Sequence, residues 1–238
     1  MSSICRNLPM AVRTVVPGLS IWKPFLPSSE EASLLSSLSN FREKILSGSI
    51  TSETRKGRNY LSRQHNLETS EEYKLVHLAN QTFQYFDSYG GKGHSLTYGI
   101  GNQNIPDFVK AHLISKILQL PEMKVYKEKA LDWNFTFNTY SVDEGKKLAG
   151  FPRHKDIPEN GIVTFIYSLG APSEFEIEDP ITQKVYRYPL LSGSLLGMRE
   201  HARWECLHAV VPQTIEGSLP FLRKDEHRYS AVLGFHEK

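Results

Sequence analysis

The sequence predicts a mainly β fold of the α+β class, in which N-terminal helices pack on one sheet of a two-layered β-sandwich or jelly roll. Apolar residues in the first half of the 238-residue chain recur at helical spacing, whereas apolar and polar residues alternate after Pro121. Helices followed by many short strands are typical of such a two-layer arrangement. We expect one domain over 1–238, with helical support and a substrate lid in 1–130 and the jelly-roll core in 131–238.

The composition sets wide limits on function. A hydrophobic content of 39% is enough for a real core, and a formal net charge of +2 permits an acidic partner such as nucleic acid without arguing for one. Two cysteines form no disulfide framework and fit a reducing compartment. Because no apolar run reaches the length of a signal peptide or a membrane span, we expect a cytoplasmic protein that binds no membrane. We also expect a monomer.

The first half predicts one short strand and three helices. Apolar residues over 15–22 indicate a short strand before a proline. Capping boxes, a hydroxyl followed three positions later by a carboxylate, begin at Ser28 and Thr69 and predict helices over 29–46 and 69–86. A third helix, with proline in its first turn, is expected over 104–120.

Two stretches in this half are candidates for substrate contacts. Segment 51–66 is basic, and Arg58 and Tyr60 within it could grip a phosphate and stack on a base, although a solvated loop gives the same pattern. Tyr98 is followed by a glycine and is the second candidate; it could equally be an aromatic in a turn that packs on the core.

The second half predicts the strands of the jelly roll. Over 133–140 the apolar residues face one way and Asn138 and Tyr140 face the other, as expected for a strand that lines a site. A continuous apolar run over 162–169 indicates a buried strand. Prolines and glycines separate further strands, which are expected near 173–178, 183–189, 193–199, 205–211 and 228–235.

The chemistry is concentrated at His154, Asp156 and His208. His154 and Asp156 are two positions apart, so on an extended segment both side chains leave the same face. His208 lies far downstream in an apolar run. Two histidines and one carboxylate form the facial triad that holds Fe(II) and leaves positions open for co-substrate and oxygen. The alternative is a cluster of polar residues with a structural role. Cys206 would share the strand face of His208, as a further ligand or as a small buried residue.

The order of these motifs resembles the AlkB-like family of Fe(II)/2-oxoglutarate dioxygenases. It runs Asn138-x-Tyr140, His154-x-Asp156, His208 and Arg228-x-Ser230, and the resemblance covers about residues 95–236. It implies a double-stranded β-helix, the jelly roll expected above. In this family a Tyr-Gly pair similar to Tyr98 and its glycine lies in the lid over the substrate.

The resemblance implies the site roles and the reaction. Fe(II) would be held by the triad, and 2-oxoglutarate by Arg228 and Ser230, with Asn138 and Tyr140 as further hydrogen-bonding partners. With O2, such an enzyme hydroxylates an N-methyl carbon of an alkylated base in DNA, RNA or a nucleotide, and the product releases formaldehyde. Succinate and CO2 are the other products. The other reading of Arg228 is an ordinary surface arginine.

Two departures from the family pattern keep the substrate open. The family usually has a second arginine six residues after the first, where this chain has Gly234, and an asparagine where it has Ser230. The loss of the second arginine puts nucleobase demethylation in doubt but leaves the oxygenase class intact. The alternative hypothesis is therefore an oxygenase that hydroxylates or demethylates a protein side chain or a small molecule.

Overall fold

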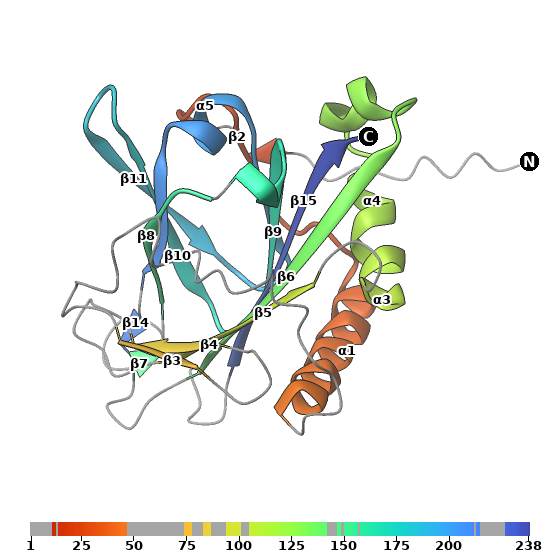
Figure 1. Ribbon diagram of the computed structural model, residues 1–238, viewed down its shortest axis with the longest axis vertical. Coiled ribbons are helices and arrows are strands. Elements are labelled where there is room, and N and C mark those ends of the chain that lie inside the picture. Colours follow the sequence, from red (N-terminus) through yellow and green to blue (C-terminus); the bar gives the residue numbers. More distant parts are fainter. Residues whose placement is uncertain are drawn as a thin grey trace, which may run out of the picture.

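Two antiparallel sheets form the body of the molecule, and helices cover the larger one (Figure 1). The computed structural model describes residues 11–12, 14–46, 74–77, 83–86, 94–100, 105–141, 147–148, 150–156, 158–211, 213–214 and 227–238. The predicted fold class, a mainly β jelly roll with N-terminal helices on one sheet, is confirmed. Among the described residues, no helix has both the length and the hydropathy that a membrane span requires.

The larger sheet has nine strands. Their order is β1 (Ala11–Val12), β2 (Leu19–Trp22), β12 (Ser194–Met198), β9 (Val163–Gly170), β15 (His227–Glu237), β6 (Leu131–Ser141), β5 (His94–Ile100), β4 (Phe83–Phe86) and β3 (Lys74–His77). Neighbours that are far apart in sequence, such as β2 with β12 and β15 with β6, are typical of a jelly roll rather than a meander.

The smaller sheet has four strands and faces the larger one. Its order is β11 (Lys184–Leu190), β10 (Ser173–Asp179), β13 (Leu207–Val211) and β8 (Phe151–His154). A separate strand pair joins β14 (Gln213–Thr214) to β7 (Lys147–Leu148). Strands were thus correctly predicted near 173–178, 183–189, 193–199 and 205–211.

Helices pack on the outer face of the larger sheet. The main one, α1 (Ser28–Leu46), begins where the capping box predicted and buries Leu34, Leu38 and Phe41, which recur at helical spacing. A continuous helical segment follows from α3 (Asp107–Val109) through the π-helical η2 (Lys110–Ile114) to α4 (Ser115–Ile117). Shorter elements are η3 (Pro121–Tyr126), η4 (Pro158–Asn160) and α5 (Glu200–Trp204).

The helix predicted over 69–86 is wrong. This part of the chain contains β3 and β4, which extend the larger sheet through β5. The aromatic residues at 83, 85 and 86 favour strands. Pairing with a neighbouring strand outweighs the local capping signal, as tertiary contacts often outweigh weak helix propensity.

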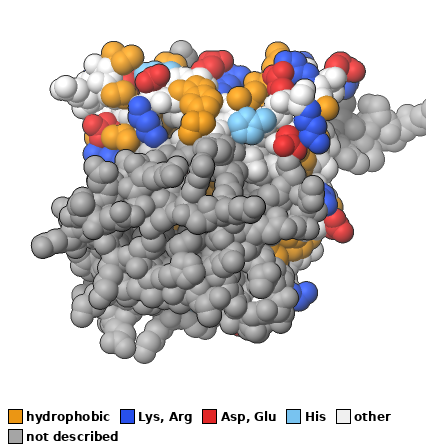
Figure 2. All heavy atoms as spheres, viewed as in Figure 1, with side chains coloured by type: hydrophobic (Ala, Val, Ile, Leu, Met, Phe, Trp, Pro, Cys, Tyr) orange, Lys and Arg blue, Asp and Glu red, His pale blue; other side chains and the backbone are white. Residues whose placement is uncertain are grey.

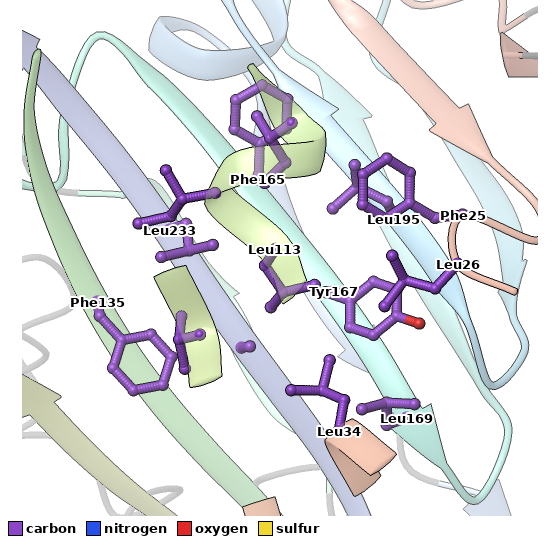
Figure 3. Close-up of a cluster of buried hydrophobic side chains, with 14 of the residues drawn as sticks. Phe25, Leu26, Leu34, Leu113, Phe135, Phe165, Tyr167, Leu169, Leu195 and Leu233 are labelled. Atoms are coloured by element: carbon purple, nitrogen blue, oxygen red, sulfur yellow. The ribbon is translucent and has the colours of Figure 1, made fainter. Parts of the chain in front are cut away.

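Side chains alternate between two cores on opposite faces of the larger sheet. On β15, Tyr229, Ala231, Leu233 and Phe235 join the core under the helices, while Val232 packs on the core between the sheets. Figure 3 shows the first core, which combines Leu34 of α1 and Leu113 of η2 with Phe135, Tyr167, Leu169 and Leu233 of the sheet. The helical layer thus fixes the strands whose other face points into the jelly roll.

Candidate metal centre

His154, Asp156 and His208 meet between the sheets because β8 pairs with β13. The backbone register places His154 directly opposite His208, and the two rings lie 4.2 Å apart. Asp156 follows two residues after His154, just beyond the end of β8. The predicted spacing therefore brings the three side chains to one point.

The distances between the three side chains fit one cation. Nε2 of His154 lies 3.7 Å from Oδ1 of Asp156, and Nε2 of His208 lies 3.9 Å from the same oxygen. One ligand atom from each residue falls within 4.8 Å of the others. Each of the three side chains is less than a tenth exposed. Two imidazoles and a carboxylate are the donor set that suits a non-haem Fe(II).

The electrostatics of Asp156 also suit a cation. Burial alone would raise the pKa of Asp156, but the nearby imidazoles of His154 and His208 and the guanidinium of Arg203 outweigh it and hold the pKa far below its usual range. The group is therefore an anion at neutral pH. Its Oδ1 accepts a hydrogen bond from Asn160 at 3.2 Å. Its Oδ2 is buried and accepts none from the described residues, so it is available to a metal.

Arg203 fixes the backbone of the turn that carries Asp156. Its Nε donates to the carbonyl of Gly161 at 3.1 Å, and one of its terminal nitrogens donates to the carbonyl of Asp156 at 3.0 Å. Arg203 itself is almost fully buried, with 1% of its surface exposed. The sequence suggested Arg203 only as a residue that could line the mouth of the site or lie in a solvated turn, and it did not single out Asn160, because nothing in the local sequence shows that either reaches Asp156.

Position 234 has no room for a side chain. A Cβ built on this residue would overlap the backbone carbonyl oxygen of Asn160, because η4 lies directly on β15. The amide of Ile162 donates to the carbonyl of Phe235 at 2.8 Å and ties the end of the turn to the same strand. The turn backbone therefore occupies the place where the resemblance leads one to expect an arginine.

The residues expected to bind 2-oxoglutarate lie on two paired strands. Arg228 and Tyr140 are direct partners between β15 and β6, as are Ser230 and Asn138. Arg228 is fully buried; its guanidinium lies 4.5 Å from the centre of the Tyr140 ring, and its Nε donates to Ser168 at 3.0 Å. Arg228 is thus not a surface arginine. Ser168 was missed in the sequence because it meets Arg228 only through the β9–β15 pairing.

Tyr140 is a neutral hydrogen-bonding group in this cluster. Burial raises the pKa of Tyr140, and the charge of Arg228 and the hydrogen bonds of the neighbouring side chains offset that rise only in part. The phenol therefore keeps its proton at neutral pH. Asn138 is buried, and its side-chain oxygen has no hydrogen-bond partner among the described residues. Both groups can bind a polar molecule.

One pocket joins these two groups of residues. The space within it, counted together with space open to solvent, is about 480 Å³. All three candidate metal ligands line it, together with Asn138, Tyr140, Ser230 and apolar side chains such as Phe151 and Ile166. Among the described residues, Arg228 does not line the pocket itself, but its guanidinium contacts the ring of Tyr140, which does.

The substrate candidates are less well placed. Arg58 and Tyr60 lie outside the described residues. Tyr98 lies in β5, where its backbone pairs with that of Phe137, and not in a turn; its side chain is outside what the structure describes. On the face of the molecule seen in Figure 2, basic and acidic side chains are interspersed over the described part, without a patch of one sign.

Comparisons with known proteins support the fold. No protein-family model matches the sequence, and no curated protein matches it. A Pseudomonas putida prolyl-4-hydroxylase superposes with a TM-score of 0.51 over 93% of each chain, at 14% identity. A prolyl hydroxylase bound to a hypoxia-inducible-factor peptide, from Trichoplax adhaerens, superposes with a TM-score of 0.50 over 92% of this chain and 83% of that one, at 18% identity.

A structure named OsALKBH1 overlaps less well, with a TM-score of 0.48 and 15% identity over 92% of this chain and 99% of that one. The two prolyl hydroxylase superpositions show a shared fold, and at identities of 14% and 18% they show no closer relationship. The chain has the jelly-roll fold of the prolyl hydroxylases, with a buried His-Asp-His group between its two sheets.

Proposed function

We propose that the protein is an Fe(II)- and 2-oxoglutarate-dependent dioxygenase. The observation that carries this proposal is the convergence of His154, Asp156 and His208, all buried, on a pocket that also contains Asn138 and Tyr140. A polar cluster with a purely structural role would be expected to satisfy its own hydrogen bonds. Here the Oδ2 atom of Asp156 accepts none from the described residues.

His154, Asp156 and His208 would hold Fe(II), and a bound Fe(II) would supply the site at which O2 is activated. The protein's own contribution is to fix the ligand set. Asn160 orients the carboxylate of Asp156, and Arg203 holds the backbone on either side of the turn. Second-layer contacts of this kind tune how firmly a metal is bound.

Arg228 would bind the distal carboxylate of 2-oxoglutarate. A guanidinium can donate two parallel hydrogen bonds to a carboxylate, and its burial strengthens the pairing because water does not compete. Ser230, Asn138 and Tyr140 lie beside it with hydroxyl and amide groups and would fix the orientation of the co-substrate. Tyr140 lines the pocket and contacts Arg228, which does not line it, so for Arg228 to bind the co-substrate the Tyr140 ring would lie alongside the bound molecule or turn aside.

The leading substrate hypothesis is an alkylated nucleobase in DNA or RNA. The order of the site motifs supports it through the resemblance to AlkB-like proteins, with Arg58, Tyr60 and Tyr98 as contacts to a flipped base. Overall, O2, 2-oxoglutarate and an N-methyl group give succinate, CO2 and an N-hydroxymethyl group. That product then breaks its carbon–nitrogen bond to release formaldehyde and the free base.

The second hypothesis is oxidation of a protein side chain or a small molecule. A specific observation favours it: the backbone of η4 fills the place at Gly234 where a second arginine is expected. Two of the structures that share this fold are named as prolyl hydroxylases, and one of them holds a peptide. In this case the overall reaction stops at the hydroxylated carbon, or goes on to release formaldehyde where that carbon is an N-methyl group.

Succinate formation from 2-oxoglutarate tests both levels of the proposal. The purified protein is incubated with Fe(II) and O2, with a methylated oligonucleotide, with proline-containing peptides, or with no substrate. His154→Ala and Arg228→Ala serve as variants, and His112→Ala, on a partly exposed histidine, serves as the control.

Turnover that requires His154 and Arg228 establishes the oxygenase. Stimulation by the methylated strand, with formaldehyde released in equal amount, supports demethylation, and stimulation by a peptide supports the second hypothesis. If the protein shows no succinate formation and no binding of Fe(II), the proposed function is wrong.

A further inference from the structure

A second group of metal-ligating side chains lies apart from the candidate centre described above. Asp179, His201 and Cys206 each offer one ligand atom, and these atoms fall within 4.8 Å of one another. Asp179 and Cys206 are buried, and His201 is 18% exposed. We propose that this group is a second metal site, selective for Zn²⁺ or a metal of similar preference. The proposal does not depend on the oxygenase function.

Three separate elements bring the ligands together. Asp179 ends β10 and Cys206 immediately precedes β13, and these two strands are paired up to Glu178 and Leu207. The next residues in the same register are Asp179 and Cys206, which therefore lie opposite each other. His201 is supplied by α5, and its carbonyl accepts the amide of Cys206 at 3.3 Å. Metal binding would join a hairpin end, a helix and a strand.

The distances suit a tetrahedral ion. Nε2 of His201 lies 3.1 Å from Oδ1 of Asp179. Two ligands bound to zinc at about 2.0–2.1 Å in tetrahedral geometry are separated by about 3.3 Å. The nitrogen and the carboxylate are hydrogen-bonded in this structure, and a zinc ion could replace the proton between them with little change in their separation. The carboxylate is also held in place, because it accepts hydrogen bonds from the amide of Ile181 and the hydroxyl of Thr182, both at 3.0 Å.

The ligand types distinguish this group from the first one. A thiolate, an imidazole and a carboxylate are a mixed donor set that suits zinc, whereas the first group contains no sulfur. The thiolate and the carboxylate together balance the two positive charges of the ion, so the complex itself is neutral and can lie in the interior. On binding, the thiol of Cys206 gives its proton to solvent. Three protein ligands leave a fourth position for water or another small ligand.

The second site would lie next to the first along the same strand. Cys206 and His208 are two residues apart and share a strand face, and two residues span about 7 Å of strand. An ion at the second site would fix the start of β13, and with it the position of His208. It would also hold α5, which carries Arg203.

Cobalt(II) substitution in the full-length protein tests the proposal. A cobalt ion bound by a thiolate shows a sulfur-to-cobalt charge-transfer band in the near ultraviolet, and a His-Asp-His site cannot produce one. We expect this band in the wild-type protein and its loss in Cys206→Ser. The only other cysteine in the chain is Cys5, so Cys5→Ser is the matched control and should retain the band.

Three further measurements separate the outcomes. His154→Ala should retain the band, because the first group does not contribute to it. His201→Asn changes a partly exposed position and should weaken or abolish the band. If Cys206→Ser does not fold, this variant tests whether the group binds the metal. Added zinc should displace cobalt from the band and raise the melting temperature of the wild type but not of Cys206→Ser. No band in the wild type, or a band lost only in Cys5→Ser, would overturn the proposal.

Discussion

The same strands form both faces of the larger sheet, but one face packs on the helices and the other lines the pocket. On β6 and β15 most of the residues that face the helices are apolar, and Phe137 stacks on Tyr229 with ring centres 5.7 Å apart. Their neighbours one position along, Asn138 and Ser230, face the pocket. A period of two therefore separates the residues that hold the sheet from the residues that can act on a ligand. Changes on the helix-covered face should alter stability, and changes on the pocket face should alter chemistry.

The largest expected effect is on the pocket face. His208→Ala removes one of the three candidate metal ligands, so we expect Fe(II)-dependent succinate formation to fall below detection. The helix-covered core does not include His208, and circular dichroism should therefore show an unchanged fold. Titration of Fe(II) binding under anaerobic conditions checks the cause. Full activity in this variant would remove His208 from the site.

The opposite face should respond in the opposite way. Phe137→Ala deletes a ring that packs on both Phe41 and Tyr229, and large-to-small changes of this kind cost about 3–5 kcal/mol of unfolding free energy. Urea denaturation measures the loss. The KM for 2-oxoglutarate of the folded protein should stay within about twofold, because the ring does not line the pocket. A large change in KM would show that the two faces are coupled.

Glycine substitutions sharpen the comparison. Gly234→Ala would place a Cβ on the carbonyl oxygen of Asn160, and we expect it to cost about 3 kcal/mol of unfolding free energy because backbone must move. Gly197→Ala is the matched control on a neighbouring part of the sheet. Its Cβ would lie 3.1 Å from the rings of Phe165 and Trp22, which can adjust, so it should cost less. Equal losses in urea denaturation would contradict the steric account of Gly234.

Asn160→Ala should affect metal binding more than stability. The change removes the hydrogen bond to Oδ1 of Asp156, and the loss of a group that orients a metal ligand typically costs 10–100-fold in affinity. Competition with a coloured chelator measures Fe(II) affinity, and Asn160→Asp tests whether the amide donor is required. An unchanged affinity in both variants would show that Asn160 does not position the ligand.

The smallest effect is expected on the outer face of the smaller sheet. Burial alone would raise the pKa of Glu176, but hydrogen bonds from Arg153 and Arg187 and their charges lower it below the usual value. The ion pairs therefore add stability above about pH 4.3, the unfolded pKa, and lose it as the pH falls through the lower folded pKa. Glu176→Gln should reduce the difference in unfolding free energy between pH 7 and pH 3 by about 1 kcal/mol or less. Denaturant midpoints at pH 3 and pH 7 provide the check.

The sequence predicted what depends on local pattern. The alternation along 133–140 correctly assigned Asn138 and Tyr140 to one face, because strand geometry fixes that face without knowledge of the fold. The helix of residues 28–46 followed from its cap and its spacing.

Tertiary contacts were not predictable in this way. Ser168 reaches Arg228, and Arg203 reaches the turn after Asp156, only once distant strands and a helix are assembled. The same limit explains the wrong helix over 69–86, where pairing with β5 decides the structure. The steric reason for Gly234 also lies in a turn that is distant in the sequence.

The two hydrogen bonds of Arg203 join the segment that carries Asp156 to the segment that leads to His208, so a redesign of this centre would have to exchange both segments together. Arg203 lies five residues before His208, and it holds the carbonyls of Asp156 and Gly161. The carboxylate and the second histidine are therefore parts of one unit, although they are distant in sequence. Moving the centre into another scaffold, or recombining it with that of a related protein, would require segments 154–161 and 199–208 to travel as a pair. Crossovers between the two segments should yield folded chains whose ligands no longer meet.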